Sequence, residues 1–132
     1  MRNYRVTLED AIHGHQEALK FGGCEGIRDV NAILSALARP YHGYHHWIYE
    51  KAAALVHGII TSHGFVDCNK RTAYYLIDLL TEKSKLHDGR RYEIIASDRE
   101  IEDMFVGVAN GETDYEELTV WFRGCIQPQN RE

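Results

Sequence analysis

The sequence has little proline, little cysteine and no long hydrophobic run. It holds two prolines, Pro40 and Pro128, and no repeat or low-complexity linker, which excludes a collagen-like or disordered chain. No apolar run approaches the ~18 residues that suggest a membrane span. A chain of 132 residues is long enough to form one core and too short for two. We therefore expect a single domain over residues 1–132.

Positive charge is also in deficit, since 15 lysines and arginines face 20 acidic residues and give a net charge of −5. General nucleic-acid binding usually needs a basic excess and is therefore disfavoured. The cysteines, Cys24, Cys68 and Cys125, form no CxxC pair or metal-ligand pattern, and their odd number favours reduced thiols. Residues 8–10, Leu-Glu-Asp, stand where a signal peptide needs apolar residues. We expect a cytoplasmic protein without a membrane segment.

Helical signals dominate the rest of the chain. Three capping boxes open predicted helices: Thr7–Asp10, Ser97–Glu100 and Thr113–Glu116. Together with apolar spacing of three and four residues, they predict helices over about residues 7–21, 29–39, 47–62, 69–85, 98–109 and 114–125. Residues 41–46 are predicted as a loop, and residues 86–95 as a turn with a short extended piece. Residues 73–80 are apolar nearly all round, so we predict an all-α fold of about six helices around the 69–85 helix.

A polar stretch connects two of these apolar helices. It reads His63-Gly64-Phe65-Val66-Asp67-Cys68-Asn69-Lys70-Arg71-Thr72. Packing between core helices gives no reason for so many polar and charged side chains, and loops held by a rigid scaffold often carry function. Phe65 is the apolar exception and is predicted to anchor the loop in the core.

The residue types in this stretch fit phosphate chemistry. The helix that starts near Asn69 offers free backbone N–H groups and the positive end of its dipole, which bind anions. Lys70 and Arg71 oppose that dipole, so their position makes sense if a bound anion compensates. Asp67 offers an oxygen ligand for Mg²⁺, and His63 offers a base near neutral pH. The set predicts phosphoryl or nucleotidyl transfer.

Each of these features, taken alone, also has a structural explanation. An Asn-Lys-Arg helix start is often a solvated surface turn, Asp67 also fits a helix N-cap, and His63 also fits a capping or packing histidine. A phosphate-binding P-loop is excluded, because its second glycine is missing, Arg71 intrudes and no strand precedes it.

The stretch resembles the signature loop of the Fic/Doc superfamily, H-x-F-x-[DE]-G-N-x-R, and residues 70–72, Lys-Arg-Thr, resemble its Doc (death-on-curing) branch. Further resemblance is found over residues 22–23, 26–29, 35–40, 49–54, 109–111 and 118–122, so it covers about residues 7–125. The resemblance implies the small Fic-type helical bundle with this loop at its centre. It also implies a toxin that pairs with a cognate antitoxin.

The resemblance further implies an activity and residue roles. The type member of the Doc branch transfers the γ-phosphate of ATP to a threonine of elongation factor Tu and so halts translation, which implies ATP as the substrate and Mg²⁺ as the cofactor here. By this resemblance, His63 takes the proton from the target hydroxyl and Asp67 binds Mg²⁺. Asn69, Lys70 and Arg71 hold phosphates.

Two alternatives to the kinase remain open. Fic relatives whose loop continues G-N-G-R-x-x-R transfer AMP instead, and here Lys70 replaces their second glycine and Tyr74 their later arginine. Both changes favour the kinase branch over the AMP transferase. The other alternative is a catalytically inert Fic-fold interaction protein. The self-inhibiting motif [ST]-x-x-x-E-[GN] fails, because Leu118 follows Glu117, so inhibition by an antitoxin in trans is expected.

Two residues depart from the family pattern. Gly64 replaces the usual proline and is expected to loosen the loop. Cys68 replaces glycine or alanine, which is tolerated freely only at negative φ. It is either a passive small residue or a thiol of lowered pKa whose oxidation blocks the site.

Three further groups of residues have open interpretations. His57 is a candidate support for the site from the preceding helix. The cluster His42, His45 and His46 is a weak candidate for metal binding, since no cysteine or carboxylate completes it nearby. Arg28 and Asp29 form either a structural pair, which we favour, or a nucleotide contact.

Overall fold

The computed structural model describes residues 3–43 and 45–130, and most of these residues lie in helices. They are α1 (Leu8–Leu19), α2 (Val30–Ala38), the short 3-10 helix η1 (Arg39–Tyr41), α3 (Ile48–Ser62), α4 (Asn69–Lys83), α5 (Asp98–Ala109) and α6 (Tyr115–Cys125). Strands β1 (Tyr92–Ile94) and β2 (Ile126–Pro128) form a small antiparallel pair in which Glu93 lies opposite Gln127. The all-α prediction is confirmed.

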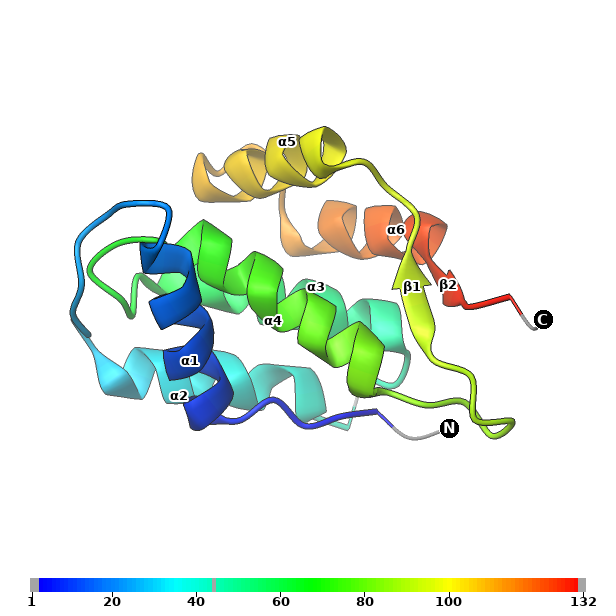
Figure 1. The fold of residues 1–132 in the computed structure, drawn as a ribbon. Helices are drawn as coiled ribbons and strands as arrows, with labels where there is room; N and C mark the ends of the chain where they lie inside the picture. Colours follow the sequence, from blue (N-terminus) through cyan, green and yellow to red (C-terminus); the bar gives the residue numbers. More distant parts are fainter. Residues whose placement is uncertain (1–2, 44, 131–132) are drawn as a thin grey trace.

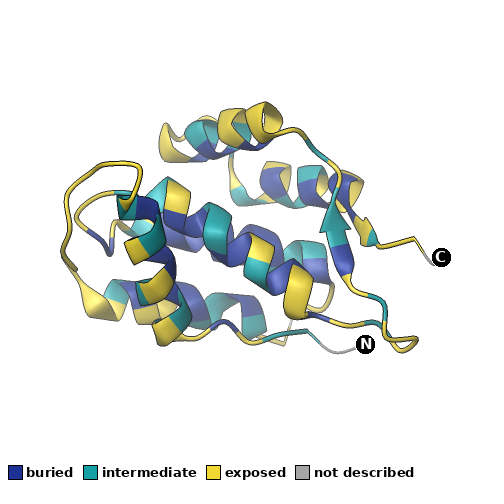
Figure 2. Ribbon diagram, in the orientation of Figure 1, coloured by how far each residue is buried: buried dark blue, intermediate teal, exposed yellow. Residues whose placement is uncertain are grey.

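Helices α3 and α4 run through the middle of the molecule, with α1 and α2 on one side and α5 and α6 on the other (Figure 1). α3 packs against α2, α4, α5 and α6, whereas α4 packs mainly against α3 and α1. Nine of the 15 residues of α3 are buried, against six of the 15 of α4, so α3 is the more central of the two. Figure 2 shows this burial along the facing sides of both helices.

Most predicted helix ends agree with the structure, because caps are local signals. Thr7 and Ser97 close capping boxes with Asp10 and Glu100, as predicted. The last helix starts one residue later than its predicted box, since Asp114 caps it and pairs with Glu117.

Two predicted segments agree with the structure only in part. In the predicted loop over residues 41–46, Tyr41 closes η1 and Tyr44 lies outside the described residues. The extended piece within residues 86–95 is β1, but its partner β2 carries no alternation that would have revealed it.

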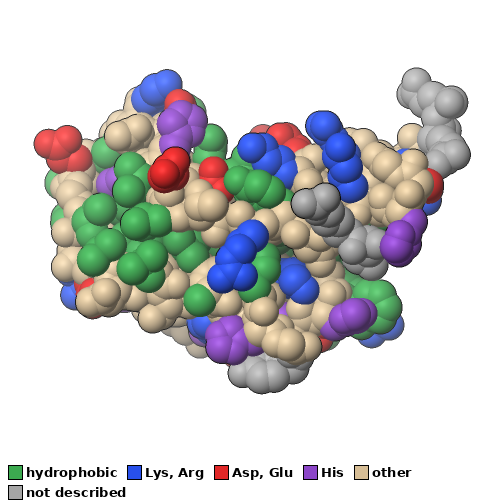
Figure 3. Space-filling model, turned by 90° about the horizontal axis from the view of Figure 1, so that it is seen from below, with side chains coloured by type: hydrophobic (Ala, Val, Ile, Leu, Met, Phe, Trp, Pro, Cys, Tyr) green, Lys and Arg blue, Asp and Glu red, His purple; other side chains and the backbone are tan. Residues whose placement is uncertain are grey.

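The underside of the molecule carries apolar side chains in contact with solvent (Figure 3). Ile27, Val30 and Leu34 lie three and four residues apart at the beginning of α2 and are exposed. Ile33 and Leu37 of the same helix are buried in the core. Among the described residues, no helix combines the length and the hydrophobicity that crossing a bilayer requires.

Candidate active site

The loop between α3 and α4 begins and ends on a strained residue. His63 follows α3 with φ 51°, and Cys68 precedes α4 with φ 64°, both in the left-handed region. Residues with a side chain rarely adopt this conformation, which persists only where the surroundings enforce it. Cys68 therefore has the positive φ at which a side chain is not freely tolerated.

A segment between α1 and α2 holds one side of this loop. The carbonyl of Gly64 accepts the N–H groups of Arg28 and Asp29 at 2.8 and 3.0 Å, and a β-bridge pairs Ile27 with Phe65. The Arg28 Nε–H donates to the carbonyl of His63 at 2.8 Å, and so satisfies the end of α3. Asp29 accepts N–H groups as the cap of α2. Arg28 and Asp29 thus have structural partners, as we favoured.

Gly64 is a packing residue and does not loosen the loop. It is buried, and a Cβ added to it would lie 2.4 Å from Cγ1 of Ile33 and 3.3 Å from the carbonyl oxygen of Asp29. The expectation of a looser loop was wrong, because the missing side chain lets the loop approach α2 closely.

The loop is also held from within. Phe65 is 2% exposed and lies under the loop, outside the cavity described below. The Asn69 amide bonds both backbone groups of Phe65: its Oδ1 accepts the N–H at 3.3 Å and its Nδ2 donates to the carbonyl at 3.0 Å. The Asn69 side chain therefore fixes the loop to the first residue of α4.

Asp67 presents an ionised carboxylate on the exposed side of the loop. Its Oδ2 accepts the Cys24 N–H at 3.0 Å, and its Oδ1 accepts the Cys68 N–H at 2.8 Å. These two backbone donors hold the pKa of the Asp67 carboxyl below its usual range. A carboxylate offers about four acceptor positions, so lone pairs remain for a cation. Asp67 thus fits the role of an Mg²⁺ ligand, which favours one or two carboxylates plus phosphate oxygens.

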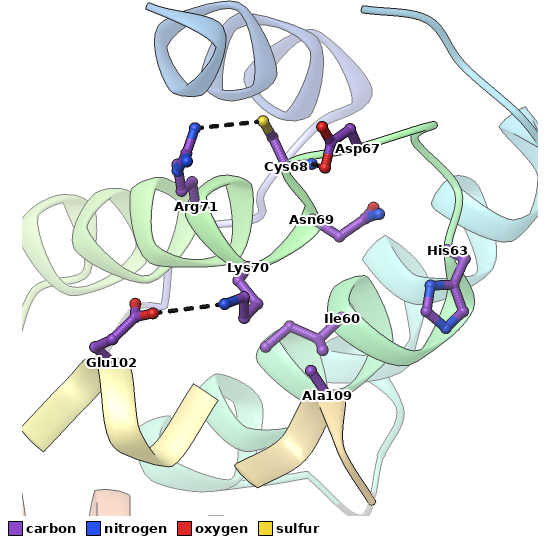
Figure 4. A pocket seen from close by; sticks show the side chains of 9 residues that line it. All are labelled: Ile60, His63, Asp67, Cys68, Asn69, Lys70, Arg71, Glu102 and Ala109. Carbon is purple, nitrogen blue, oxygen red and sulfur yellow. Dashed lines mark hydrogen bonds and ion pairs between the residues drawn. The ribbon is translucent and has the colours of Figure 1, made fainter. Parts of the chain in front are cut away.

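A cavity of about 360 Å³ opens at the start of α4 (Figure 4). Its lining brings together most of the predicted site residues: His63, Asp67, Asn69, Lys70 and Arg71, with Ile60, Cys68, Glu102 and Ala109. The exposed imidazole of His63 lies on the opposite side of the cavity from the first turn of α4. The His63 imidazole thus lies across the cavity from the N-terminus of α4, and the Asp67 carboxylate lies close to that N-terminus.

Both cations of the first turn have protein partners. Lys70 Nζ lies 3.5 Å from Oε1 of Glu102 on α5. Arg71 turns away from His63, and its Nη1 donates to the carbonyls of Gly22 at 2.9 Å and Ala18 at 3.3 Å, at the end of α1. These charges were expected to face a bound anion or to lie on a solvated surface turn, and each of them has a protein partner instead.

The thiol of Cys68 is not activated. Partial burial, and next the negative charge of Asp67, raise the pKa of the Cys68 thiol. The thiol donates to the carbonyl of Gly22 at 3.3 Å and packs closely against Gly23, where a Cβ would lie 2.5 Å from Sγ. The alternative of a lowered pKa was therefore wrong, because burial, and next the charge of Asp67, outweigh the effect of Arg71 on the thiol.

Sequence reasoning missed His15 of α1. This side chain is 5% exposed, its Nε2 lies 2.9 Å from the carbonyl oxygen of Asp67, and its ring stacks on Phe65 with centroids 4.1 Å apart. Ala11, His15 and Ala18 recur at spacings of four and three residues and are all buried. That periodicity was the available signal that His15 faces the core.

The other histidines lie away from the cavity. Among the described residues, no group of three His, Cys, Asp or Glu side chains is placed to hold a metal ion, which argues against the cluster at residues 42–46. His57 does not line the cavity. Burial, and next the charge of Arg39, lower the pKa of the His57 imidazole, and Arg39 belongs to η1. His57 is therefore a poor candidate for supporting the site.

Known proteins are similar to the part of the chain that contains this site. Residues 5–81 match the Fic/DOC family. A stretch of 62 residues is 37% identical to a protein named Toxin Doc from Mycolicibacterium smegmatis, covering 43% of this chain and 48% of that protein. The chain therefore spans about half the length of this curated relative. Because the family match covers more than half of the chain, including α3, the loop and most of α4, the chain belongs to the Fic/Doc family.

Proposed function

We propose that the chain is a Doc-type toxin that transfers a phosphoryl group from ATP to a hydroxyl side chain of a protein. The target by resemblance is elongation factor Tu, whose modification would inhibit translation. The observation that carries the proposal is the cavity at the start of α4, where His63 faces the helix N-terminus and Asp67 lies beside it. Membership of the Fic/Doc family and similarity to a protein named Toxin Doc support it.

The roles of the residues follow from their positions. His63 accepts the proton of the incoming hydroxyl, since its exposed imidazole lines the cavity on the side opposite the start of α4, where phosphate would bind. Phosphate oxygens accept the free N–H groups at the start of α4, and Lys70 contributes its charge. Asn69 acts through its backbone, because its side chain holds Phe65. Arg71 acts through its charge, because its Nη1 is bonded to the carbonyls of Ala18 and Gly22.

Asp67 would hold Mg²⁺ together with phosphate oxygens. The bound ion would neutralise charge on the transferring phosphoryl group. The contribution of the protein is to keep this carboxylate ionised and fixed in place, which the N–H groups of Cys24 and Cys68 do.

Phosphoryl transfer is favoured over AMP transfer by two side chains. Lys70 replaces a glycine that would let the backbone approach the phosphates, and its side chain lines the cavity. Tyr74 replaces an arginine, and its hydroxyl donates to Oδ1 of Asp98 at 2.8 Å, so no cation stands there. AMP transfer to a protein hydroxyl is the runner-up function.

The partners follow from the same proposal. A toxin of this kind acts in the cytoplasm on its protein target and needs a cognate antitoxin. The sequence lacks the self-inhibiting motif, since Leu118 follows Glu117 and is fully buried, so inhibition comes in trans. With a net charge of −5, the chain offers no general attraction to nucleic acid, and antitoxin contacts would be mainly apolar.

The test compares ATP labelled at the γ-phosphate with ATP labelled at the α-phosphate. The purified full chain is incubated with each nucleotide, Mg²⁺ and elongation factor Tu, beside the His63→Ala variant. The kinase predicts label on the factor from γ-labelled ATP alone, and none with His63→Ala. Label from α-labelled ATP would establish the runner-up. If neither label is transferred and both proteins allow equal growth on expression, the inert interaction protein is the correct interpretation.

A further inference from the structure

His15 contacts the signature loop from outside it. It lies on α1, 52 residues before Asp67, and its side chain is nine-tenths buried. Its ring is nearly parallel to that of Phe65, at 11°, and its Nε2 faces the carbonyl of Asp67 at 2.9 Å. A carbonyl oxygen only accepts hydrogen bonds, so Nε2 carries the hydrogen and donates it. The contact is therefore a directed bond from α1 to the loop.

This bond fixes the peptide unit between Asp67 and Cys68. The peptide is planar, so its C=O and N–H point in opposite directions and turn together. Holding the carbonyl towards His15 points the N–H of Cys68 the other way, where it donates to Oδ1 of Asp67 at 2.8 Å. The direction of one of the two donors to the Asp67 carboxylate is thus tied to His15.

The same peptide has a less strained alternative. Turns that differ by a flip of one peptide unit interchange positive and negative φ at the residue that follows it. Cys68 has φ 64°, so turning the peptide over would bring Cys68 to a negative φ that a side chain prefers. It would also remove the carbonyl from His15 and the N–H from the Asp67 carboxylate. The hydrogen bond from His15 opposes this relaxation.

We propose that His15 is a positioning residue: it holds the Asp67–Cys68 peptide so that the Asp67 carboxylate and the start of α4 stay set for Mg-ATP. This rests on the proposed function, in which Asp67 is the Mg²⁺ ligand. His15 acts through the loop backbone and touches no reacting atom.

Two variants separate the donor from the ring. His15→Phe keeps an aromatic ring beside Phe65 and lacks the donor, whereas His15→Gln places an amide donor near the position of Nε2 and lacks the ring. We expect His15→Phe to raise the Kd for Mg-ATP by about tenfold, the effect of losing one well-formed polar contact. His15→Gln should stay within about threefold of the original chain. If His15→Gln binds as weakly as His15→Phe, ring packing and not the donor is responsible, and the proposal is wrong.

A second comparison uses Cys68→Gly. Glycine accepts positive φ without strain, so the peptide no longer gains by turning over. The loss caused by His15→Phe should therefore shrink to about threefold or less in the Cys68→Gly background. A residue that only stabilised the fold would give the same loss in both backgrounds, and that result would overturn the proposal.

The position of the Cys68 amide resonance, measured by NMR without nucleotide, makes the test independent of activity. It should shift in His15→Phe and remain near its original position in His15→Gln. If the original chain binds no Mg-ATP, the proposed function fails, and the amide resonance still decides whether His15 holds the peptide. Should His15→Phe not fold, His15→Met, which also lacks a donor, takes its place in both measurements.

Discussion

Arg71 joins the first turn of α4 to the last turn of α1 and the residues that follow it, because its Nη1 donates to the carbonyl of Ala18 in α1 at 3.3 Å and to that of Gly22, just after the helix, at 2.9 Å. The last carbonyls of a helix lack intrahelical partners and carry partial negative charge, so a guanidinium satisfies both needs. This contact explains why an arginine stands at a helix start, where its charge is unfavourable for that helix alone. It also draws α1, and with it His15, against the signature loop.

The first prediction concerns this contact. Arg71→Ala should lower the free energy of unfolding by about 1 kcal/mol, because it removes hydrogen bonds from a charged donor that remains in contact with water. Arg71→Lys should recover part of the charge effect and little of the geometry, since lysine lacks the planar fork. Urea unfolding of the three proteins measures this. Equal midpoints for all three would show that the bond to α1 contributes nothing in solution.

The second prediction separates catalysis by His63 from its backbone conformation. His63 has φ 51°, which asparagine adopts more readily than most residues and glycine adopts freely. His63→Asn and His63→Gly should both lower the transfer rate by about 10²–10⁴-fold, the usual effect of losing a positioned base. Both should unfold at or above the original denaturant midpoint, because the imidazole is exposed. If either variant keeps the transfer rate of the original chain, His63 is not the base.

The third prediction compares two glycines. Gly64→Ala should destabilise the fold by about 1–3 kcal/mol, because its Cβ would lie 2.4 Å from Cγ1 of Ile33. Gly124→Ala is the matched control: it is exposed on α6 with nothing within 4 Å of an added Cβ. It should stabilise the helix by about 0.5–1 kcal/mol. The same sign of change for both glycines would contradict the packing described for Gly64.

The sequence predicted the helices better than it predicted their contacts. Caps such as that at Ser97 are decided by neighbouring residues, and the helix beginning at Asn69 was placed correctly. The role of Arg71 depends on carbonyls some 50 residues earlier in the chain, and no local pattern encodes that distance. The spacing of the buried residues of α1 indicates that His15 faces the core, but not that it contacts Asp67, 52 residues later.

The loop residues illustrate a second limit. Whether Gly64 loosens or tightens the loop depends on how closely Ile33 approaches it, which composition does not reveal. The pKa of the Cys68 thiol depends first on its burial and then on the charges of Asp67 and Arg71, and the fold sets all three. Sequence therefore identified which residues gather at the site, whereas the fold decides how each is held.

The last prediction concerns Asp78, on the outer side of α4 beside an apolar hollow that Tyr74 and Phe105 help to line. Desolvation by partial burial, and next the negative charges of Glu82 and Asp98, raise the pKa of Asp78 to about 6. The folded chain thus binds this proton more tightly than the unfolded chain, whose aspartates titrate near pH ~4. The contribution of Asp78 to the free energy of unfolding is therefore fully present below pH ~4 and is lost as the pH rises through about 6.

Asp78→Asn should remove this pH-dependent loss. Since Asp78 remains exposed to water, which screens its charge, we expect the gain in unfolding free energy at pH ~8 to be about 1 kcal/mol. At pH ~4 the variant and the original chain should differ little, because the aspartic acid is then neutral in the folded state. Asp103→Asn, which changes an exposed residue of α5, is the matched control. Thermal unfolding of the three proteins from pH ~4 to ~8 measures the difference, and an unaltered pH dependence in Asp78→Asn would show that the carboxyl is not perturbed as its surroundings indicate.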